Sequence, residues 1–439
     1  MLGTRHPDAP PKDGTGTVLA AHRDPNVLRW LTAYTASLLG DSIYFLALGF
    51  AAARTASPAG VGMVMAVGAV PRALFLLGGG VVADRFGPRR VVIGSDAARS
   101  VLILGAAVVL ALASPGLWLL VCVAAVFGVV DALFMPAVGA LPPRLVPRDQ
   151  LVRFQGMRAL AVRTGDIAGP PLGGLAMGLG GASAAFALAG GLFAVSVPLL
   201  VTTRIGAMKA GHTPAPAPAP AAGAEDSTGT SAWAELRGGL RYIRRHRLVG
   251  PLVLSGALSE LGLAGPLNVG MVLLARQRGW GSSGYGWIIA AFGAGAATSA
   301  LLLALRGGVR RAGVVQIVTL FVGSAAIGLI GAAPVLGAAV ALALLAGLIC
   351  GVCGGLAVAM IQSACDPGYL GRVTSVMSLT GFGLAPLVYP VFGVAVAAFG
   401  PTAVFLTSAA VGMLGGAVGL ASSAVRRASG PLATAKAPH

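Results

Sequence analysis

A short charged turn between two long apolar stretches is the most informative part of this sequence. Residues 80–90 run Gly80-Val-Val-Ala-Asp84-Arg85-Phe-Gly87-Pro-Arg89-Arg90. The two glycines permit a tight turn and a close approach of the flanking helices. Asp84 is an acid on an otherwise basic rim, so we expect it to have a specific partner. The apolar stretches on either side reach the length of about 20 residues that a helix needs to cross a bilayer.

The composition of the whole chain is that of a membrane protein. Of the 439 residues, 56% are hydrophobic and only 10% are charged. A typical soluble chain has about 25% charged residues. These figures exclude an ordinary soluble enzyme and a disordered protein, and they indicate a polytopic membrane protein. Residues 1–29 are polar and lack the apolar core of a signal peptide, so we expect the first span to act as its own insertion signal.

Twelve segments are long and apolar enough to be transmembrane helices. Glycine and proline punctuate several short connections between them, as in Gly180-Gly181 and Gly400-Pro401. We therefore predict an all-α polytopic membrane protein with 12 transmembrane helices. The predicted spans are 30–53, 60–82, 91–113, 117–139, 154–177, 182–203, 249–274, 284–305, 314–332, 335–360, 373–398 and 402–425.

The basic residues predict the orientation of the chain. If the N-terminus is cytoplasmic, 24 of the 31 Lys and Arg residues fall in cytoplasmic segments, against three on the opposite side. Cytoplasmic loops carry such an excess in most membrane proteins. We therefore expect a multi-pass protein of the cell membrane (the inner or plasma membrane) with both termini in the cytoplasm. The net charge of +17 is then an orientation signal and requires no nucleic-acid partner.

A long interruption divides the spans into two groups of six. It begins with a Pro- and Ala-rich run at residues 214–220, whose composition indicates an extended linker. The predicted organisation is a cytoplasmic tail (1–29), an N-terminal six-helix bundle (30–203), a cytoplasmic linker (204–248), a C-terminal six-helix bundle (249–425) and a second cytoplasmic tail (426–439).

The end of the linker, residues 231–247, has the pattern of a basic amphipathic helix. Trp233, Leu236, Leu240 and Ile243 recur at helical spacing, and arginines occupy much of the remaining surface. Such a helix lies in the plane of the bilayer and is attracted to anionic lipids. We expect it to rest on the inner leaflet and to support the first span of the second bundle.

The turn at residues 80–90 resembles the loop 2–3 signature of the major facilitator superfamily. The shared spacing is G-x-x-x-D-R-x-G-x-R-R, in the second loop of a twelve-span chain. The resemblance implies the major facilitator fold of two six-helix bundles. It also implies that Asp84, Arg85 and Arg89 form a charge-paired latch against the opposite half, which stabilises the outward-facing state. The residues of this gating loop are Gly80, Asp84, Arg85, Gly87, Arg89 and Arg90.

A Gly- and Pro-rich stretch in the fifth span is similar to an element of family members that act as antiporters. That element has the pattern G-x-x-x-G-P-x-x-G-G, carried here by Gly165, Gly169, Pro170, Gly173 and Gly174. Prolines bend the helix and glycines let a neighbour pack closely. With further stretches in spans one to four, this resembles the twelve-span drug-exporter branch that includes macrolide efflux proteins. The resemblance implies efflux by proton antiport and a role in drug resistance.

Nine Asp, Glu and Arg residues lie within the predicted spans, where each costs at least about 2.5–3.5 kcal/mol and faces the bundle interior. Two i, i+3 pairs can form along single helices, Asp96 with Arg99 and Arg163 with Asp166. We interpret the first pair as structural and retain the second among the cavity candidates. Five residues have no partner along their own helix: Asp41, Asp131, Glu260, Arg72 and Arg158.

Depth in the membrane distinguishes two of the acids. Asp41 and Glu260 lie roughly 17 Å from the inner ends of spans one and seven, which are equivalent positions in the two halves. The family resemblance adds that spans one, four, seven and ten line the central cavity, so Asp131 in span four would face it too. A carboxyl group in a dry site can hold a proton and release it when water or a cationic substrate arrives. The alternative for Asp41 is a structural ion pair with Arg72.

These observations predict a secondary active transporter that works by alternating access around a mid-membrane site. We expect proton-coupled efflux of a small, partly hydrophobic, drug-like compound. The chain has no G-x-x-x-x-G-K-[ST] motif, so the driving force is expected to be an ion gradient. The cavity acids favour a cationic substrate, and the arginines keep an anion possible. Alternatives are an importer, an exporter of a siderophore, lipid or metabolite, and a membrane sensor or scaffold that has lost transport.

We expect neither enzymatic activity nor a cofactor or metal site. The predicted spans contain no histidine, and the C-x-x-C of Cys350 and Cys353 lacks further ligands, so we interpret both cysteines as packing residues. The expected partners are a small-molecule substrate, protons and the lipid bilayer with its anionic inner-leaflet lipids. We expect the protein to be a monomer.

Overall fold

The computed structural model describes residues 22–113, 116–203, 232–306 and 309–429, which are helical with short connections and contain no strand. The all-α class is therefore confirmed. The rest of the expected N-terminal tail (residues 1–21), most of the linker (204–231) and the end of the C-terminal tail (430–439) lie outside the described residues.

The helices of the first half begin at residues that favour helix initiation. Asp24 caps the first helix by accepting a hydrogen bond of 2.8 Å from the Asn26 N–H, and Ser57 caps the second by accepting one of 3.3 Å from Gly60. A proline at the first position follows each cap, where its missing N–H has no partner to lose. The elements are α1 (Pro25–Thr55), α2 (Pro58–Phe86), α3 (Pro88–Leu112), α4 (Leu117–Gly139), α5 (Pro142–Leu145), η1 (Arg148–Gln150) and α6 (Leu151–Thr202).

The second half has a π-helical turn near the middle of its first crossing. In this turn, η2, the side chain of Asn268 donates a hydrogen bond of 2.9 Å to the Ala264 carbonyl. Such π-turns occur often at functional sites. The elements are α7 (Ala232–Arg245), α8 (Val249–Gly265), η2 (Pro266–Gly270), α9 (Met271–Gln277), α10 (Gly281–Arg306), α11 (Ala312–Ala332), α12 (Leu336–Ala364), α13 (Pro367–Gly383), α14 (Ala385–Ala421) and α15 (Ser423–Arg427).

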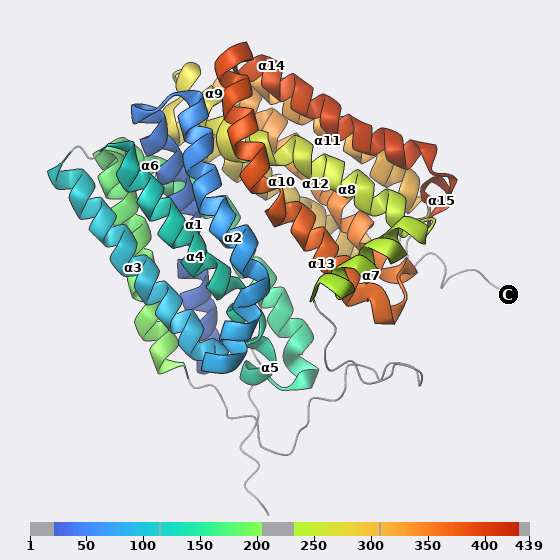
Figure 1. Cartoon of the computed structure of the whole chain (residues 1–439), viewed down its shortest axis with the longest axis horizontal. Coiled ribbons are helices and arrows are strands. Elements are labelled where there is room, and N and C mark those ends of the chain that lie inside the picture. The colour runs from blue at the N-terminus through green and yellow to red at the C-terminus, as the bar shows by residue number, and fades with distance from the viewer. Residues whose placement is uncertain (1–21, 114–115, 204–231, 307–308, 430–439) are drawn as a thin grey trace, which may run out of the picture.

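Ten helical segments of the described residues are long and apolar enough to cross a membrane. Two of them, Arg153–Thr202 and Gly368–Ala421, have 50 and 54 residues. A straight helix of that length would span about 75–80 Å, more than twice the hydrocarbon core of a bilayer. Each contains a glycine with a positive φ, 67° at Gly181 and 77° at Gly400, and Figure 1 shows α14 turning back on itself. Counted as two crossings each, they bring the total to twelve, consistent with the prediction.

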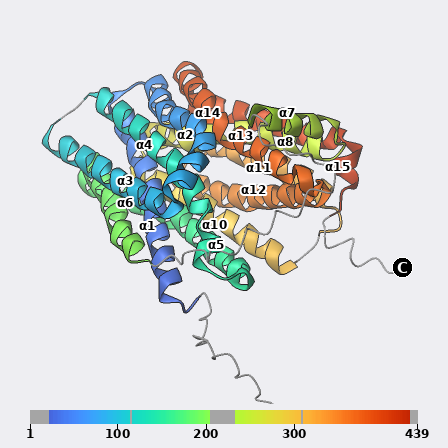
Figure 2. The ribbon, with the colours of Figure 1, turned by 60° about the horizontal axis from the view of Figure 1, so that its bottom comes forward.

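The two halves form two helix bundles that lie side by side. Figure 1 shows α1–α6 in blue to green and α8–α15 in yellow to red, and the turned view in Figure 2 keeps the two groups apart. The bundles meet where α2 packs on α14 and where α6 packs on α10. At these crossings a Cβ on Gly62 would lie 2.4 Å from the Tyr389 carbonyl oxygen, and one on Gly174 would lie 2.7 Å from that of Ser282. Glycine therefore lets the backbones of the two halves touch, as in other packed membrane helices.

Candidate functional site

Five charged residues from four helices of the first bundle form one cluster. Arg99 on α3 lies at its centre, with Nη2 2.7 Å from Asp131 Oδ1 and Nη1 3.4 Å from Asp41 Oδ1. Arg99 Nη1 also lies 3.6 Å from Oδ1 of Asp96, one turn earlier on the same helix. The second guanidinium is that of Arg72 on α2, whose Nε lies 3.0 Å from Asp131 Oδ2. Three carboxylates and two guanidiniums thus join α1, α2, α3 and α4.

Aromatic rings enclose the guanidinium of Arg99, whose side chain is fully buried. Its Cζ lies 4.0 Å from the ring centre of Phe134, 5.3 Å from that of Phe127 and 5.6 Å from that of Phe193. Tyr44 stacks on Phe127, with the ring centres 3.8 Å apart. Ring faces attract a cation, and the carboxylates offset the free energy lost when the cation leaves water.

Asp96 is held by donors from two other helices. The Ser37 hydroxyl on α1 donates a hydrogen bond of 2.5 Å to Asp96 Oδ2, and the Ser196 hydroxyl on α6 donates to the same oxygen. Because hydrogen bonds to a buried carboxylate stabilise its charged form, these donors keep Asp96 fixed between α1, α3 and α6. Asp96 therefore links three helices, in addition to the contact with Arg99 along its own helix that the sequence predicted.

The members of the cluster differ in their access to the surroundings. The side chains of Arg99 and Asp96 are 0% exposed and that of Asp131 is 5% exposed, whereas Asp41 is 19% and Arg72 is 25% exposed. Asp41 is therefore the most accessible carboxylate of the cluster, and its contact to Arg99 is longer than that of Asp131.

From the sequence, Asp41 and Asp131 have no partner along their own helices, and Arg99 is assigned to Asp96 alone. The structure supplies the partner across helices, because Arg99 contacts all three acids. Arg72 pairs with Asp131, so its ion pair differs from the one with Asp41 that the sequence offered as an alternative. Sequence reasoning missed Arg99 as the central residue because the i, i+3 rule already gave it a local partner.

A cavity of about 210 Å³ lies between the two bundles, next to this cluster. Both halves contribute polar side chains to its lining. Asp131 and Arg72 line it, and Asp41 is joined to Asp131 through Arg99, which contacts both. Its polar lining residues are Tyr44, Arg72 and Asp131 from the first half and Glu260, Asn268 and Tyr389 from the second.

Glu260 on α8 is the carboxylate that the second half places at this cavity. It is half-buried, and within the described part of the chain it forms no ion pair. Glu260 also lines a second cavity inside the C-terminal bundle. The two halves are therefore unequal at this site, because the first half holds its acids in ion pairs and the second presents one that is in no ion pair among the described residues.

Arg158, Arg163 and Asp166 lie on the first part of α6, away from the cluster. Arg163 Nη1 lies 3.2 Å from Asp166 Oδ2, which is the pair expected along this helix. Arg158 Nη1 donates to Gln155 Oε1 at 3.4 Å, and its Cζ lies 5.8 Å from the ring centre of Tyr34. None of the three lines either of the two cavities described above.

The glycines of the antiporter-like element form the packing surface of α6. A Cβ on Gly165 would lie 2.9 Å from Leu38 Cβ, and one on Gly169 would lie 2.5 Å from Ser42 Cβ, both on α1. On another side of α6, the Pro170 carbonyl oxygen lies 2.6 Å from the position of a Cβ on Gly286 of α10. The element thus packs α6 against its own bundle and also against the other one. Gly173 faces α1 at Ile43, and Gly174 faces α10.

The gating loop connects α2 to α3 through Gly87, whose φ is 84°. Arg89 Nη2 donates a hydrogen bond of 2.7 Å to the Val201 carbonyl at the end of α6, within the same bundle. Arg85 and Arg90 are exposed, and the Arg85 Cζ lies 5.8 Å from the ring centre of Phe86. The side chain of Asp84 lies outside the part of the chain that the structure describes, as do the surroundings of Gly80. The contact of Arg89 seen here is thus inside one bundle, and the latch across bundles stays a prediction.

The helix α7 rests on the beginning of α13. Tyr242 stacks on Tyr369 with ring centres 4.4 Å apart, and its hydroxyl donates to Asp366 Oδ2 at 3.2 Å. Four arginines and Leu240 form an open surface on α7. These arginines are Arg237, Arg241, Arg244 and Arg245.

No group of His, Cys, Asp and Glu suited to hold a metal ion occurs among the residues that the structure describes. Cys350 and Cys353 are free thiols there.

In a comparison with protein families, residues 30–381 match the Major Facilitator Superfamily. Among curated relatives, the enterobactin exporter EntS of Salmonella typhimurium (strain LT2) is 25% identical over 337 residues, which cover 74% of this chain and 77% of the relative. The enterobactin exporter EntS of Escherichia coli O139:H28 is 26% identical over 337 residues, covering 74% of this chain and 76% of the relative.

Solved transporter structures have the same fold at low sequence identity. A bacterial homologue of the human lysosomal transporter Spinster, in an inward-facing and occupied conformation, has a TM-score of 0.67 and 14% identity, covering 91% of this chain and 96% of the other. The nucleoside transporter NupG has a TM-score of 0.68 and 14% identity, covering 91% of this chain and 99% of the other. The arrangement of two helix bundles predicted from the sequence is thereby confirmed.

Proposed function

The chain belongs to the major facilitator superfamily, and from this premise we propose that it exports a small, partly hydrophobic, drug-like compound in exchange for protons. Membership of the family makes it a multi-pass transporter of the inner membrane with a small-molecule substrate. Export is supported by the enterobactin exporters among its relatives. The proton coupling, the antiport mechanism and a role in drug resistance are the proposed part.

The observation that carries the proposal is the cavity between the bundles with its unequal acids. Asp131 is held in place by ion pairs to Arg72 and Arg99. Glu260 lines the same cavity and forms no ion pair in the described part of the chain. A carboxyl group in such a position can bind either a proton or a cationic substrate, which is the exchange that an antiporter requires.

The charge balance of the cluster supports Asp41 as a second proton site. Three carboxylates and two guanidiniums give it a formal charge of −1 when all are ionised. An uncompensated charge inside a membrane protein is unfavourable, so the uptake of one proton stabilises the cluster. Asp96 is fixed by Ser37 and Ser196 and Asp131 by two arginines, which leaves Asp41 as the acceptor. A proton there would release Arg99 toward Asp131.

The test measures substrate-induced proton movement in vesicles that contain the wild type, Asp41→Asn or Glu260→Gln. The panel contains ethidium, tetraphenylphosphonium, a macrolide and enterobactin. We expect each variant to lose about half of the proton movement per substrate transported, because one of the two exchangeable protons is gone. Asp149→Asn, at an exposed acid in η1, is the matched control. Full coupling in both cavity variants would remove the proton-site assignment.

The cargo is a separate question within the same proposal. Enterobactin is named for relatives that are 25–26% identical, and Arg72 in the cavity wall admits an anionic group. Flux of enterobactin without flux of the cations would therefore replace the drug-like cargo and keep the exporter. Absence of flux for every compound would favour a sensor or scaffold that has lost transport.

We also propose that the protein is a monomer with both termini in the cytoplasm, and that the arginines of α7 rest on anionic lipids. The exposed basic side chains of this helix support the lipid contact, because they attract acidic headgroups. A higher melting temperature in phosphatidylglycerol than in phosphatidylcholine bilayers is expected. Equal melting temperatures in the two lipids would contradict the lipid contact.

A further inference from the structure

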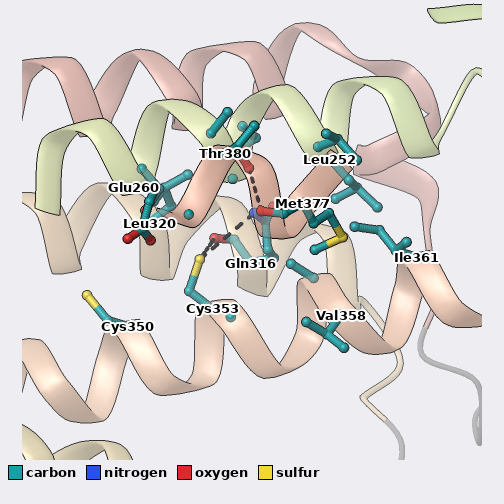
Figure 3. A pocket seen from close by; sticks show the side chains of 18 of the residues that line it. Leu252, Glu260, Gln316, Leu320, Cys350, Cys353, Val358, Ile361, Met377 and Thr380 are labelled. Carbon is teal, nitrogen blue, oxygen red and sulfur yellow. Dashed lines mark hydrogen bonds between the residues drawn. The ribbon is translucent and has the colours of Figure 1, made fainter. Parts of the chain in front are cut away.

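A second cavity, of about 250 Å³, lies inside the C-terminal bundle among α8, α11, α12 and α13. Most of its wall is apolar, with Leu252, Leu320 and Met377 among the lining residues. Figure 3 shows polar side chains within this wall. The polar residues of the wall are Ser255, Ser259, Glu260, Gln316, Cys350, Cys353 and Thr380.

Gln316 is the unusual member of this wall. Its side chain is 1% exposed, and its Nε2 donates a long hydrogen bond of 3.9 Å to Cys353 Sγ. Its Oε1 is buried and has no hydrogen-bond partner among the described residues. Figure 3 shows Gln316 beside Cys353 at the cavity. Buried amide oxygens are nearly always hydrogen-bonded, so an orphaned one at a cavity points to a donor that comes from outside the chain.

The second cavity adjoins the cavity between the bundles. Glu260 and Gly381 line both this cavity and the one between the bundles. The 210 Å³ central cavity and the 250 Å³ side cavity are each below the range of about 300–1,000 Å³ that is usual for ligand sites, whereas the two joined fall within it. A molecule bound at Glu260 can therefore extend into the central cavity or into the side cavity.

We propose that the side cavity is a substrate subsite for an apolar or aromatic group that carries an N–H or O–H donor. The donor bonds to Gln316 Oε1, the apolar body packs on the aliphatic wall, and a cationic group of the same molecule lies at Glu260. This inference rests on the proposed function and narrows its substrate class, since it separates cations with a hydrogen-bond donor from those without one.

The first test compares two lipophilic cations with the purified protein in nanodiscs. Ethidium has aromatic amines that donate hydrogen bonds, whereas tetraphenylphosphonium has no N–H or O–H group. In Gln316→Met, which keeps the length of the side chain, we expect the Kd for ethidium to rise about tenfold and that for tetraphenylphosphonium to change less than about twofold. Gln277→Met, at an exposed position on α9, is the matched control and should leave both unchanged.

A second measurement does not depend on the folding of the Gln316 variant. In a Cys122→Ser, Cys365→Ser background, a methanethiosulfonate reagent reports on Cys350 and Cys353, which line the side cavity. We expect saturating ethidium to slow their modification at least about fivefold, because a bound ligand excludes the reagent.

The outcomes separate this inference from the proposed function. Any of three results would overturn the subsite. They are equal losses of affinity for ethidium and tetraphenylphosphonium in Gln316→Met, unchanged cysteine labelling in the presence of ethidium, and no ethidium binding by the wild type. Proton-coupled transport in the vesicle assay would stand after any of these results. If wild-type vesicles show no proton movement with transport, but Gln316→Met still weakens ethidium binding alone, the proposed proton coupling is overturned and the subsite stands.

Discussion

At the scale of single residues, Arg99 determines the arrangement of the first bundle. One guanidinium contacts three acids on α1, α3 and α4, inside a shell of phenyl rings. Its exposure is 0%, so water cannot replace any contact that is removed. A buried cluster of this kind sets the positions of its helices, because each carboxylate has to lie where the guanidinium can reach it.

The first prediction concerns the charge of this cluster. Arg99→Met changes its formal charge from −1 to −2, and we expect a loss of about 3–5 kcal/mol of stability because buried acids lose their partner. Adding Asp131→Asn restores the formal charge of −1 and should recover part of the loss. Thermal unfolding of the purified protein measures both, with Arg23→Met at an exposed site as control. A double variant less stable than Arg99→Met alone would contradict this account.

At the scale of elements, the contacts of α6 explain why its glycines follow a regular spacing. Gly165, Gly169 and Gly173 recur every four residues and face α1, while Gly174 and Pro170 face α10. The same helix thus has a tight contact inside its bundle and another across the bundles. Side chains at these positions would hold the backbones apart, which weakens packing that depends on close approach.

The second prediction tests this contact with a single methyl group. In Gly169→Ala the new Cβ would lie 2.5 Å from Ser42 Cβ, so α1 and α6 have to move apart. We expect a loss of about 1–3 kcal/mol, as for other overpacked sites. Gly191→Ala on the same helix is the control, since a Cβ there meets nothing within 4 Å. The comparison uses the melting temperature and the yield of monodisperse protein, and equal values for both variants would refute the packing argument.

At the scale of the whole molecule, a number of crossings consistent with the structure could be predicted because the bilayer imposes a length on each crossing. The connections at Gly180-Gly181 and Gly400-Pro401 could also be predicted, because each separates two apolar stretches of membrane-spanning length. The structure has positive φ angles at Gly181 and Gly400. The partner of Asp41 could not be predicted, because Asp41 and Arg99 are 58 residues apart and meet only when α1 packs on α3. Gln316 left only a weak signal, a lone amide in an apolar span, and its orphaned oxygen depends on the packing of four helices.

The closest contacts between the bundles lie toward the membrane side where α1 ends and α2 begins. Gly62 meets Tyr389 there, and Gly174 meets Ser282. With the proposed cytoplasmic termini, this is the outer side, so the structure corresponds to a state closed to the outside. In that state Arg89 contacts Val201 in its own bundle. The proposed latch of Asp84, Arg85 and Arg89 with the other half would then belong to the opposite state.

The last prediction follows from this closed side. Alternating access requires α6 and α10 to separate there during each cycle. A Cβ on Gly178 of α6 would lie 3.7 Å from Ser283 Oγ of α10, a separation that suits a disulfide bond between cysteines at the two positions. We combine Gly178→Cys and Ser283→Cys in a protein that lacks the four native cysteines. Oxidation of this double variant should reduce transport at least about tenfold, because the disulfide bond holds the two bundles together. Adding a reductant should restore transport. The single-cysteine variants serve as controls. Ethidium should still bind the oxidised protein, because the ethidium site is reached from the cytoplasmic side. Wild-type transport by the fully cross-linked protein would show that this face does not have to open.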